Sequence, residues 1–376
     1  MAATPDTIVL IHGFWVTPRS WEDWKARYES RGYRVLTPAY PGFEVEVEAL
    51  NADPTPIEDL TVPAVVEHLE SVVSQIEPAP ILMGHSAGGV FTQLLMDRGY
   101  GAAGVAINSA PTEGVKRVPL SQIRSSFPVL KNPANRHKAV GFTFEQWRYV
   151  FTNTFSEEEA RRLYERYHIP ASGRVFWGSA LANIHPGPDD THVDYKNPNR
   201  APLLFISGSE DHLMPPSIQR SNAKHYKAEG TITEVVEYEG RAHLMPSQTG
   251  WEEIADYALD WAVEHAKGTS HGVGNDDAVA VLRQGGVWSR VSDRRSSACR
   301  QPDGVGHRSD GHDRARTSRR RRDARARRRT EAYADGAGSA QVPIRGSWRA
   351  AVAARAVRRA QPAHPLPVLL RGGCQR

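Results

Sequence analysis

An alternation of short apolar runs with helix-like stretches in the first 110 residues constrains the fold of this chain more than any other feature. The first of these runs, residues 7–12, is continuous, which is typical of a strand buried on both faces of a parallel sheet. Strands that alternate with helices in this way predict βαβ units. The next helix after the second run begins near Val62, with a loop before it. The runs are "TIVLIH" (7–12), "YRVLTPAYPG" (33–42), "ILMG" (81–84) and "GVAINSA" (104–110).

The same alternation returns near residue 201, after a segment that lacks it. "APLLFISGSED" and "TITEVVEYEG" predict two further strands, and a final amphipathic helix follows them. We therefore predict an α/β fold with a mostly parallel, doubly wound sheet, in which residues 1–111 and 201–267 form the core. Residues 112–200 are predicted to be a helical insertion rich in aromatic residues, with helices at 143–155 and 156–168 followed by the stretch "SGRVFWGSALANI" (172–184).

The composition changes near residue 267. Residues 1–267 carry 24 Lys and Arg against 34 Asp and Glu, a net charge of −10. Residues 268–376 carry 23 Arg, no Lys and 9 acidic residues, a net charge of +14. Such a composition cannot bury a core, so we predict a disordered, Arg-rich tail at 268–376.

Two interpretations of this tail are open. Many Arg, Ala, Gly and Pro residues without Lys are typical of a GC-rich gene translated out of frame, which would make the tail a frameshifted extension. Alternatively, "RRRRDARARRR" could bind a phosphate backbone. Because a charge run is more often merely solvated, we do not expect a nucleic acid partner.

Cysteine usage and hydropathy narrow the class of protein further. Both cysteines, Cys299 and Cys374, lie in the tail, so residues 1–267 have no disulfide framework and no thiol chemistry. The N-terminal sequence enters an apolar strand without the basic and long apolar regions of a signal peptide. No apolar run approaches the length of a membrane span. We expect a cytoplasmic protein without a membrane partner.

The third apolar run ends in a motif that carries chemistry. Gly84-His85-Ser86-Ala87-Gly88 has the spacing G-x-S-x-G, in which a serine projects from a sharp strand-to-helix turn. Small residues two positions before and after the serine avoid a collision in that turn. The N–H of Ala87 would then lie at a helix N-terminus, where an oxyanion could form.

A serine needs a base and an orienting acid elsewhere in the chain. Asp211 follows the strand "LLFISG", and His243 lies in the loop after the next strand, which gives the chain order Ser, Asp, His. The competing residues are weaker candidates. Glu210 is expected to be solvated, and His212 is too close in sequence to Asp211 to be its partner. His12 and His85 are expected to hold backbone or to pack.

With these motifs, residues 1–267 resemble the α/β-hydrolase fold superfamily. The resemblance implies that Ser86 is the nucleophile, His243 the general base and Asp211 the residue that fixes the histidine tautomer. "HGFW" after the first strand resembles the oxyanion loop of that superfamily, which implies that the N–H of Phe14 is the second oxyanion donor. Residues 112–200 fall where the superfamily inserts a cap between strands 6 and 7.

These residues predict acyl transfer. A serine nucleophile argues against epoxide hydrolases and haloalkane dehalogenases of this fold, which use a carboxylate. We predict a serine esterase or lactonase that acts on a small to medium apolar substrate. An amidase, a carbon–carbon bond hydrolase, a cofactor-free perhydrolase and a non-catalytic small-molecule receptor stay open. The residues predicted to line the substrate pocket are Trp15, His85, Trp147, Phe151 and Trp177.

No cofactor is called for, and the sequence does not predict an oligomeric state. The stretch "NIHPGPDDTHVD" gathers histidines and aspartates that could suggest a metal. A loop rich in Pro and Gly uses such residues in turns and at the surface, so we predict no metal site there. The residues concerned are His185, Asp189, Asp190, His192 and Asp194.

Overall fold

A parallel sheet forms the centre of the fold, in a computed structural model that describes residues 4–181, 190–268 and 281–284. Its strands have the order β2-β1-β3-β4-β7-β8-β9, and every neighbouring pair is parallel. The predicted doubly wound α/β sheet is confirmed. The strands are β1 (Thr7–Ile11), β2 (Arg34–Leu36), β3 (Ile81–His85), β4 (Ala103–Ile107), β7 (Leu203–Gly208), β8 (Thr233–Tyr238) and β9 (Val281–Gln284).

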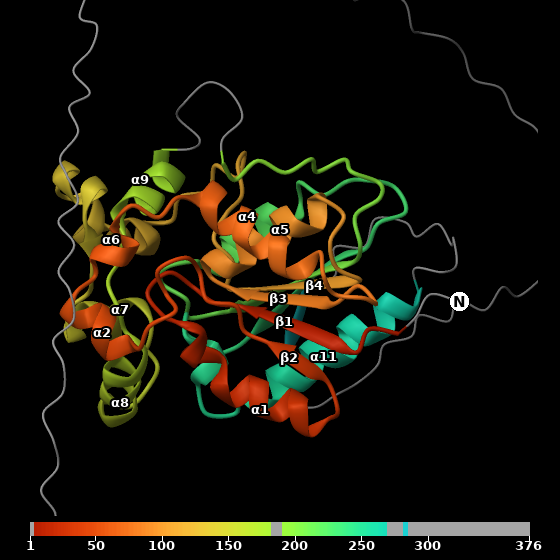
Figure 1. The fold of residues 1–376 in the computed structure, drawn as a ribbon, viewed down its shortest axis with the longest axis horizontal. Coiled ribbons are helices and arrows are strands. Elements are labelled where there is room, and N and C mark those ends of the chain that lie inside the picture. The colour runs from red at the N-terminus through yellow and green to blue at the C-terminus, as the bar shows by residue number, and fades with distance from the viewer. Residues whose placement is uncertain (1–3, 182–189, 269–280, 285–376) are drawn as a thin grey trace, which may run out of the picture. The chain divides into compact units, whose positions relative to one another are not determined.

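Helices cover both faces of the sheet (Figure 1). Successive residues of β1 pack in different clusters, with Val9 on one face and Leu10 on the other. Because side chains alternate along a strand, burial on both faces requires the continuous apolar runs seen in the sequence. One face carries α4 (Val62–Val73), α5 (Ala87–Asp97) and α10 (Pro216–Ala223), and the other carries α1 (Glu22–Ser30) and α11 (Trp251–Gly268).

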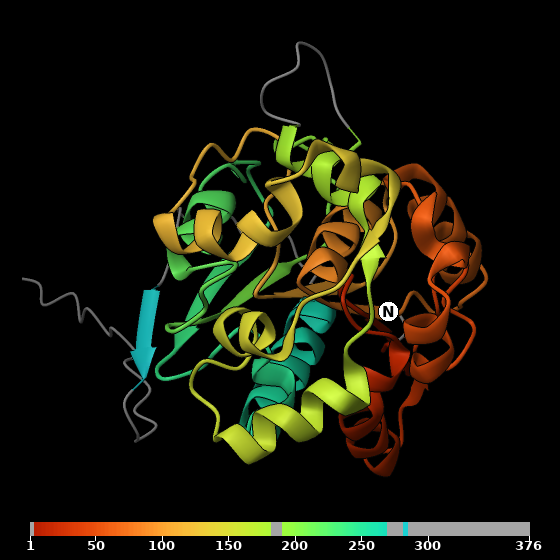
Figure 2. The same cartoon turned by 90° about the vertical axis from the view of Figure 1, so that its left-hand side faces the viewer.

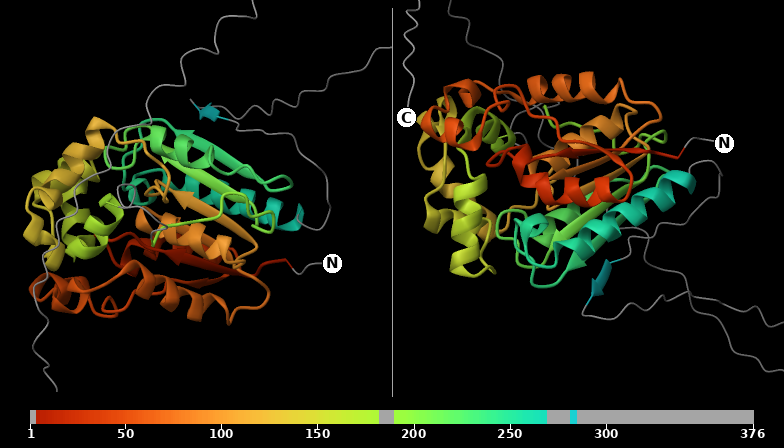
Figure 3. Two further views of the ribbon diagram at one scale, coloured as in Figure 1. Left: turned by 90° about the horizontal axis from the view of Figure 1, so that it is seen from above. Right: turned by 60° about the horizontal axis from the view of Figure 1, so that its bottom comes forward.

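The first and last of these helices lie side by side (Figure 3). The hydroxyl of Tyr28 in α1 donates to the carbonyl oxygen of Ala255 in α11 at 2.7 Å, and Arg27 forms an ion pair with Asp256. The short helices η1 (Pro18–Trp21) and η3 (Met245–Ser247) lead into α1 and α11 respectively.

The loop predicted before α4 contains two short helices, α2 (Val47–Ala52) and α3 (Thr55–Glu58). Neither has a side-chain cap at its N-terminus, and both are too short to show a helical repeat in the sequence. They form because Val47, Leu50 and Ile57 are buried against the core. The sequence prediction of a plain loop is therefore wrong here.

A helical segment follows β4 and lies beyond the carboxyl ends of the strands (Figures 1 and 2). This segment lies between β4 and β7 of the central sheet. Its own two short strands, β5 and β6, pair with each other in a separate antiparallel sheet. The predicted boundaries at 112 and 200 stay a prediction. The elements are α6 (Leu120–Leu130), η2 (Pro133–His137), β5 (Ala139–Val140), α7 (Phe144–Val150), α8 (Glu157–Tyr167), β6 (Ala171–Ser172) and α9 (Gly173–Leu181).

Most of the predicted tail lies outside the described residues. Within it, β9 is a strand that the sequence analysis did not expect, and Leu282 pairs with Val236 of β8. A run of only four residues is too short to stand out in a sequence without other periodicity. Among the helices of the described residues, none is long and apolar enough to cross a bilayer.

Candidate active site

Ser86 occupies the turn between β3 and α5. Its backbone has φ 57° and ψ −117°, a sparsely populated combination for a residue with a side chain. The turn is held by the Ser86 N–H, which donates to the carbonyl of Ile107 at 3.0 Å, and by the Ser86 carbonyl, which accepts from Ala110 at 3.0 Å. Both contacts come from the adjacent strand and the loop after it, so the sheet fixes the strained turn.

The glycines on either side of this turn are required by close approach. A Cβ on Gly84 would overlap the carbonyl oxygen of Gly88, and a Cβ on Gly88 would overlap the carbonyl oxygen of Ile11. Backbone atoms cannot move aside as a flexible side chain can. The G-x-S-x-G spacing is therefore explained by the packing of α5 against β3 and the end of β1.

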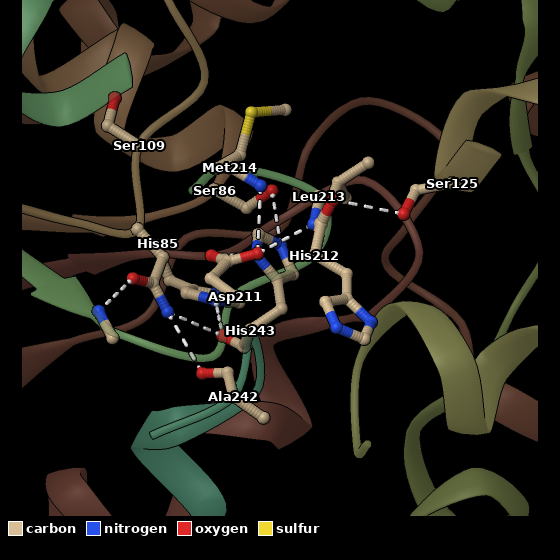
Figure 4. A network of polar contacts seen from close by, with 12 residues as sticks. His85, Ser86, Ser109, Ser125, Asp211, His212, Leu213, Met214, Ala242 and His243 are labelled. Atoms are coloured by element: carbon tan, nitrogen blue, oxygen red, sulfur yellow. Dashed lines mark hydrogen bonds and ion pairs between the residues drawn. The ribbon is translucent and has the colours of Figure 1, made fainter. Parts of the chain in front are cut away.

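The structure brings His243 and Asp211 to Ser86 (Figure 4). Nε2 of His243 lies 3.0 Å from the Ser86 hydroxyl, and Nδ1 lies 2.7 Å from Oδ2 of Asp211. The carboxylate can only accept at Nδ1, so Nδ1 carries the proton and Nε2 is free to accept from the serine. The other oxygen of Asp211 accepts from the N–H groups of Leu213 and Met214, both at 2.8 Å.

Asn108 and His85 hold the loop that carries His243, and the sequence analysis missed Asn108. Nδ2 of Asn108 donates to the carbonyls of Ala242 and His243 at 3.1 and 3.0 Å. Its Oδ1 accepts from the N–H of Gly208 at the end of β7, at 2.8 Å. Nε2 of His85 lies 2.8 Å from the same His243 carbonyl and donates to it, because a carbonyl oxygen can only accept. Burial lowers the His85 pKa to about 3, so the ring is neutral and carries its one proton on Nε2.

Phe14 and Ala87, the two predicted oxyanion donors, belong to backbone segments next to Ser86. Ala87 is the first residue of α5, so its N–H has no partner one turn earlier in the helix. The loop after β1 passes close by, since a Cβ on Gly13 would lie 3.3 Å from Cβ of Ser86. No hydrogen bond among the described residues uses the N–H of Phe14, the next residue. Phe14 and Ala87 line the same cavity as Ser86.

The competing titratable residues lie elsewhere. His12 is buried and stacks on Tyr40, with Nδ1 2.7 Å from the Gly13 carbonyl; burial lowers its pKa to about 4, so the ring is neutral and donates to that carbonyl. His212 contacts the carbonyl of Tyr149 at 2.9 Å. The side chain of Glu210 is exposed.

A largely apolar cavity of about 280 Å³ opens above Ser86. Its walls come from the turn at Ser86, the loop after β1, α5 and the helical segment. Arg117 is the only charged residue in the lining. The other lining residues are Phe14, Trp15, Val62, Ser86, Ala87, Val90, Phe91, Ala110, Pro111, Val115, Val118, Gln122, Ile123, Ser126, Phe127, Leu130, Phe176, Thr191 and Met214.

Of the residues predicted to line the pocket, only Trp15 does so. Trp147 and Phe151 stack on each other with ring centroids 4.1 Å apart, and the ring of Phe151 also packs edge-on against that of His243, 5.0 Å away. His85 faces the backbone of His243. On α9 the cavity is lined by Phe176 and not by Trp177, because neighbouring residues of a helix point about 100° apart. These four predictions are corrected.

The Asp and His stretch at 183–194 gives no metal site in the described part of the chain. His185 and Asp189 lie outside the described residues, and His192 contacts Glu113, with Nδ1 2.8 Å from Oε2. Asp194 accepts from the N–H of Lys196 in a local turn. The described residues hold no group of three or more possible metal ligands.

A sequence model described as the alpha/beta hydrolase family matches residues 8–257. No curated protein matches the chain.

Solved structures resemble the chain at low identity. A pyrethroid hydrolase from Sphingobium faniae JZ-2 is 18% identical over 70% of this chain and 100% of that chain, with a TM-score of 0.51. A thermophilic esterase from Thermogutta terrifontis is 18% identical over 70% and 92%, with a TM-score of 0.51. An extracellular alpha/beta-hydrolase from a Paenibacillus species is 21% identical over 69% and 99%, with a TM-score of 0.50. At these identities the likeness shows a shared fold.

Proposed function

The chain belongs to the alpha/beta hydrolase family, and from this premise we propose that it is a serine hydrolase that cleaves a carboxylic ester or lactone. The observation that carries the proposal is the 3.0 Å contact between the Ser86 hydroxyl and Nε2 of His243 at the wall of an apolar cavity. The 2.7 Å contact from Nδ1 to Asp211 supports it, because it leaves Nε2 able to accept a proton.

In the proposed reaction the Ser86 oxygen attacks the ester carbonyl while His243 takes the hydroxyl proton at Nε2. Asp211 stabilises the imidazolium that forms, and the proton then passes to the departing alcohol oxygen. Water enters after the alcohol leaves. His243 deprotonates this water, which attacks the acyl-enzyme carbonyl; the proton then passes from His243 to the Ser86 oxygen as the carboxylic acid leaves. No cofactor takes part in these steps.

The N–H groups of Phe14 and Ala87 are the proposed donors to the oxyanion. Each adds a hydrogen bond where negative charge develops, and loss of one such donor typically costs about 10²- to 10³-fold in rate. The loop that carries His243 is held by Asn108 and His85, which both contact the backbone carbonyl of His243. The base is thus positioned before substrate binds.

The cavity supports a small or medium apolar substrate. Its volume of about 280 Å³ lies just below the range of about 300–1,000 Å³ common for small-molecule sites. Phe14, Trp15, Phe91 and Phe176 present apolar rings to it. An uncharged acyl or aryl group therefore fits this cavity better than a charged one.

Hydrolysis of p-nitrophenyl butyrate by the full chain tests the proposal. We expect turnover that falls by at least about 10³-fold in Ser86→Ala. Ser207→Ala is the matched control, because Ser207 is also a fully buried serine at a strand end and its hydroxyl has no partner in the described residues. This control is expected to keep its activity.

Covalent labelling separates an inactive serine from an unsuitable substrate. A fluorophosphonate should react with the wild-type chain and add its mass to the peptide that contains Ser86. Folded protein that neither turns over esters nor reacts with the fluorophosphonate would contradict the proposal. Equal activity in Ser86→Ala would do so as well.

A further inference from the structure

Apolar side chains gather on the outer face of α6. Of the five large apolar residues exposed in the described part of the chain, four lie between residues 118 and 127, and the fifth is Val45. Leu120 is 84% exposed, Val118 63%, Phe127 61% and Ile123 50%. Leu120, Ile123 and Phe127 follow a helical repeat, so they form one stripe along the helix. Exposed apolar residues gathered in this way mark an interaction surface.

This stripe is continuous with the cavity above Ser86. Val118, Ile123 and Phe127 both line the cavity and reach the surface, so the cavity opens along the stripe. Figures 1 and 2 show α6 on the side of the helical segment that faces away from the sheet. Whatever covers the stripe therefore lies next to the entrance of the cavity.

The charge around the stripe is positive, in contrast to the rest of the folded part. Residues 114–144 contain six Lys and Arg and no Asp or Glu, whereas residues 1–267 as a whole have a net charge of −10. All six side chains are exposed. They are Lys116, Arg117, Arg124, Lys131, Arg136 and Lys138.

We propose that α6 and its flanking cations dock onto a lipid bilayer that carries anionic phospholipids. Exposed apolar side chains beside Lys and Arg are the combination that binds the interface of such a bilayer. The charge disfavours two other occupants: the tail has a net charge of +14, and a second copy placed face to face would bring like charges together. The sequence analysis expected no membrane partner, but a surface contact needs no spanning segment.

Docking would place the mouth of the cavity at the lipid surface. An apolar ester dissolved in the bilayer could then reach Ser86 between Val118 and Phe127 without crossing water. This last step rests on the proposed ester hydrolysis, whereas docking itself does not.

Vesicle flotation of the full chain tests the docking. We expect binding to vesicles of phosphatidylcholine mixed with phosphatidylglycerol, weaker binding to phosphatidylcholine alone, and release by added salt. In the double variant Leu120→Ser/Phe127→Ser the partition coefficient should fall at least about tenfold, because two apolar side chains no longer enter the interface. Val45→Ser is the matched control and should bind as the wild type does. Circular dichroism establishes that each variant is folded.

The double variant keeps every charge, including the Arg-rich tail. If it binds mixed vesicles as well as the wild type, the tail or general charge is responsible and the proposal is wrong. Absence of binding by the folded wild type also overturns it. A wild-type dimer in sedimentation that the double variant abolishes, with no vesicle binding, would assign the stripe to a second copy instead. Ser86→Ala should still bind vesicles, so an inactive site does not obscure the result.

Discussion

At the scale of single residues, Asn108 connects the parts of the chain that carry the proposed base, His243, and the proposed acid, Asp211. Its side chain contacts the loop of His243 and the end of β7, three residues before Asp211. It is fully buried and has φ 43°, a left-handed conformation that Asn adopts more readily than most residues. We infer that Asn108 is a positioning residue for His243.

Asn108→Ala should therefore lower kcat about tenfold with little change in KM, because substrate does not contact Asn108 but the base loses its support. Asn51→Ala is the matched control: Asn51 also donates to two carbonyls, of Val47 and His168, but contacts no residue of the proposed site. Each rate is divided by the concentration of active sites, measured by titration with a fluorophosphonate, so that misfolded protein does not lower the apparent kcat. A change in KM alone, or the same fall in the control, would refute the positioning role.

The residues of the proposed site differ in how well the sequence predicts them. Ser86, Asp211 and His243 are predictable, because a local turn motif and the ends of successive strands mark their places. Asn108 is not, because its partners lie 100 to 135 residues away and a single Asn after a strand has many possible roles. No local sequence pattern marks Asn108, because only its contacts in the folded chain reveal what it does.

At the scale of elements, the rotation of α9 decides which of its aromatic residues lines the cavity. Phe176 lines the cavity, and its ring packs 5.2 Å from that of Trp15, whereas Trp177 is absent from the lining. Phe176→Ala should enlarge the cavity and raise the rate with octanoate relative to butyrate esters of p-nitrophenol. Trp177→Ala should leave this ratio unchanged. An equal shift in both variants would show that α9 packs differently.

Helix α6 shows why one element of the insertion escaped prediction. It has no side-chain cap, begins after Pro119 and contains Pro128, all of which weaken the helical pattern. By contrast, α7 and α8 are capped by Thr143 and Ser156, and they were predicted. The apolar repeat through Leu120 and Phe127 was the signal in the sequence that could have predicted this helix. In the structure that repeat faces outward, where a helix that packs on a core would have polar residues.

At the scale of the whole molecule, the alternation of apolar runs with helix-like stretches was sufficient to predict a parallel sheet, because strands separated by helices form βαβ units. The relative placement of the insertion was not predictable to the same degree. Trp147 and Phe151 stack on each other and do not line the cavity, and aromatic content alone does not distinguish the two arrangements.

Three buried histidines couple the stability of the fold to pH. Burial lowers the pKa of His12 and His168 to about 4 and that of His85 to about 3. Nε2 of His168 accepts from the N–H of Phe142 at 2.9 Å, which only the neutral ring can do. The ordinary histidine pKa of about 6.5 applies in the unfolded chain. Below about pH 6.5 the unfolded chain therefore binds more protons than the folded chain, and the free energy of unfolding decreases as the pH is lowered.

This loss should begin near pH 6.5 and continue toward pH 4. At about pH 5 each of the three histidines lowers the free energy of unfolding by about 2 kcal/mol, against a typical total of about 5–15 kcal/mol. Urea unfolding of the wild type and His168→Gln at about pH 8 and pH 5 measures the contribution of one of them. The variant should lose about 2 kcal/mol less than the wild type between these pH values, because glutamine does not titrate. His137→Gln replaces an exposed histidine and should behave as the wild type does. Equal losses in all three proteins would mean that His168 can take up its proton without leaving the fold.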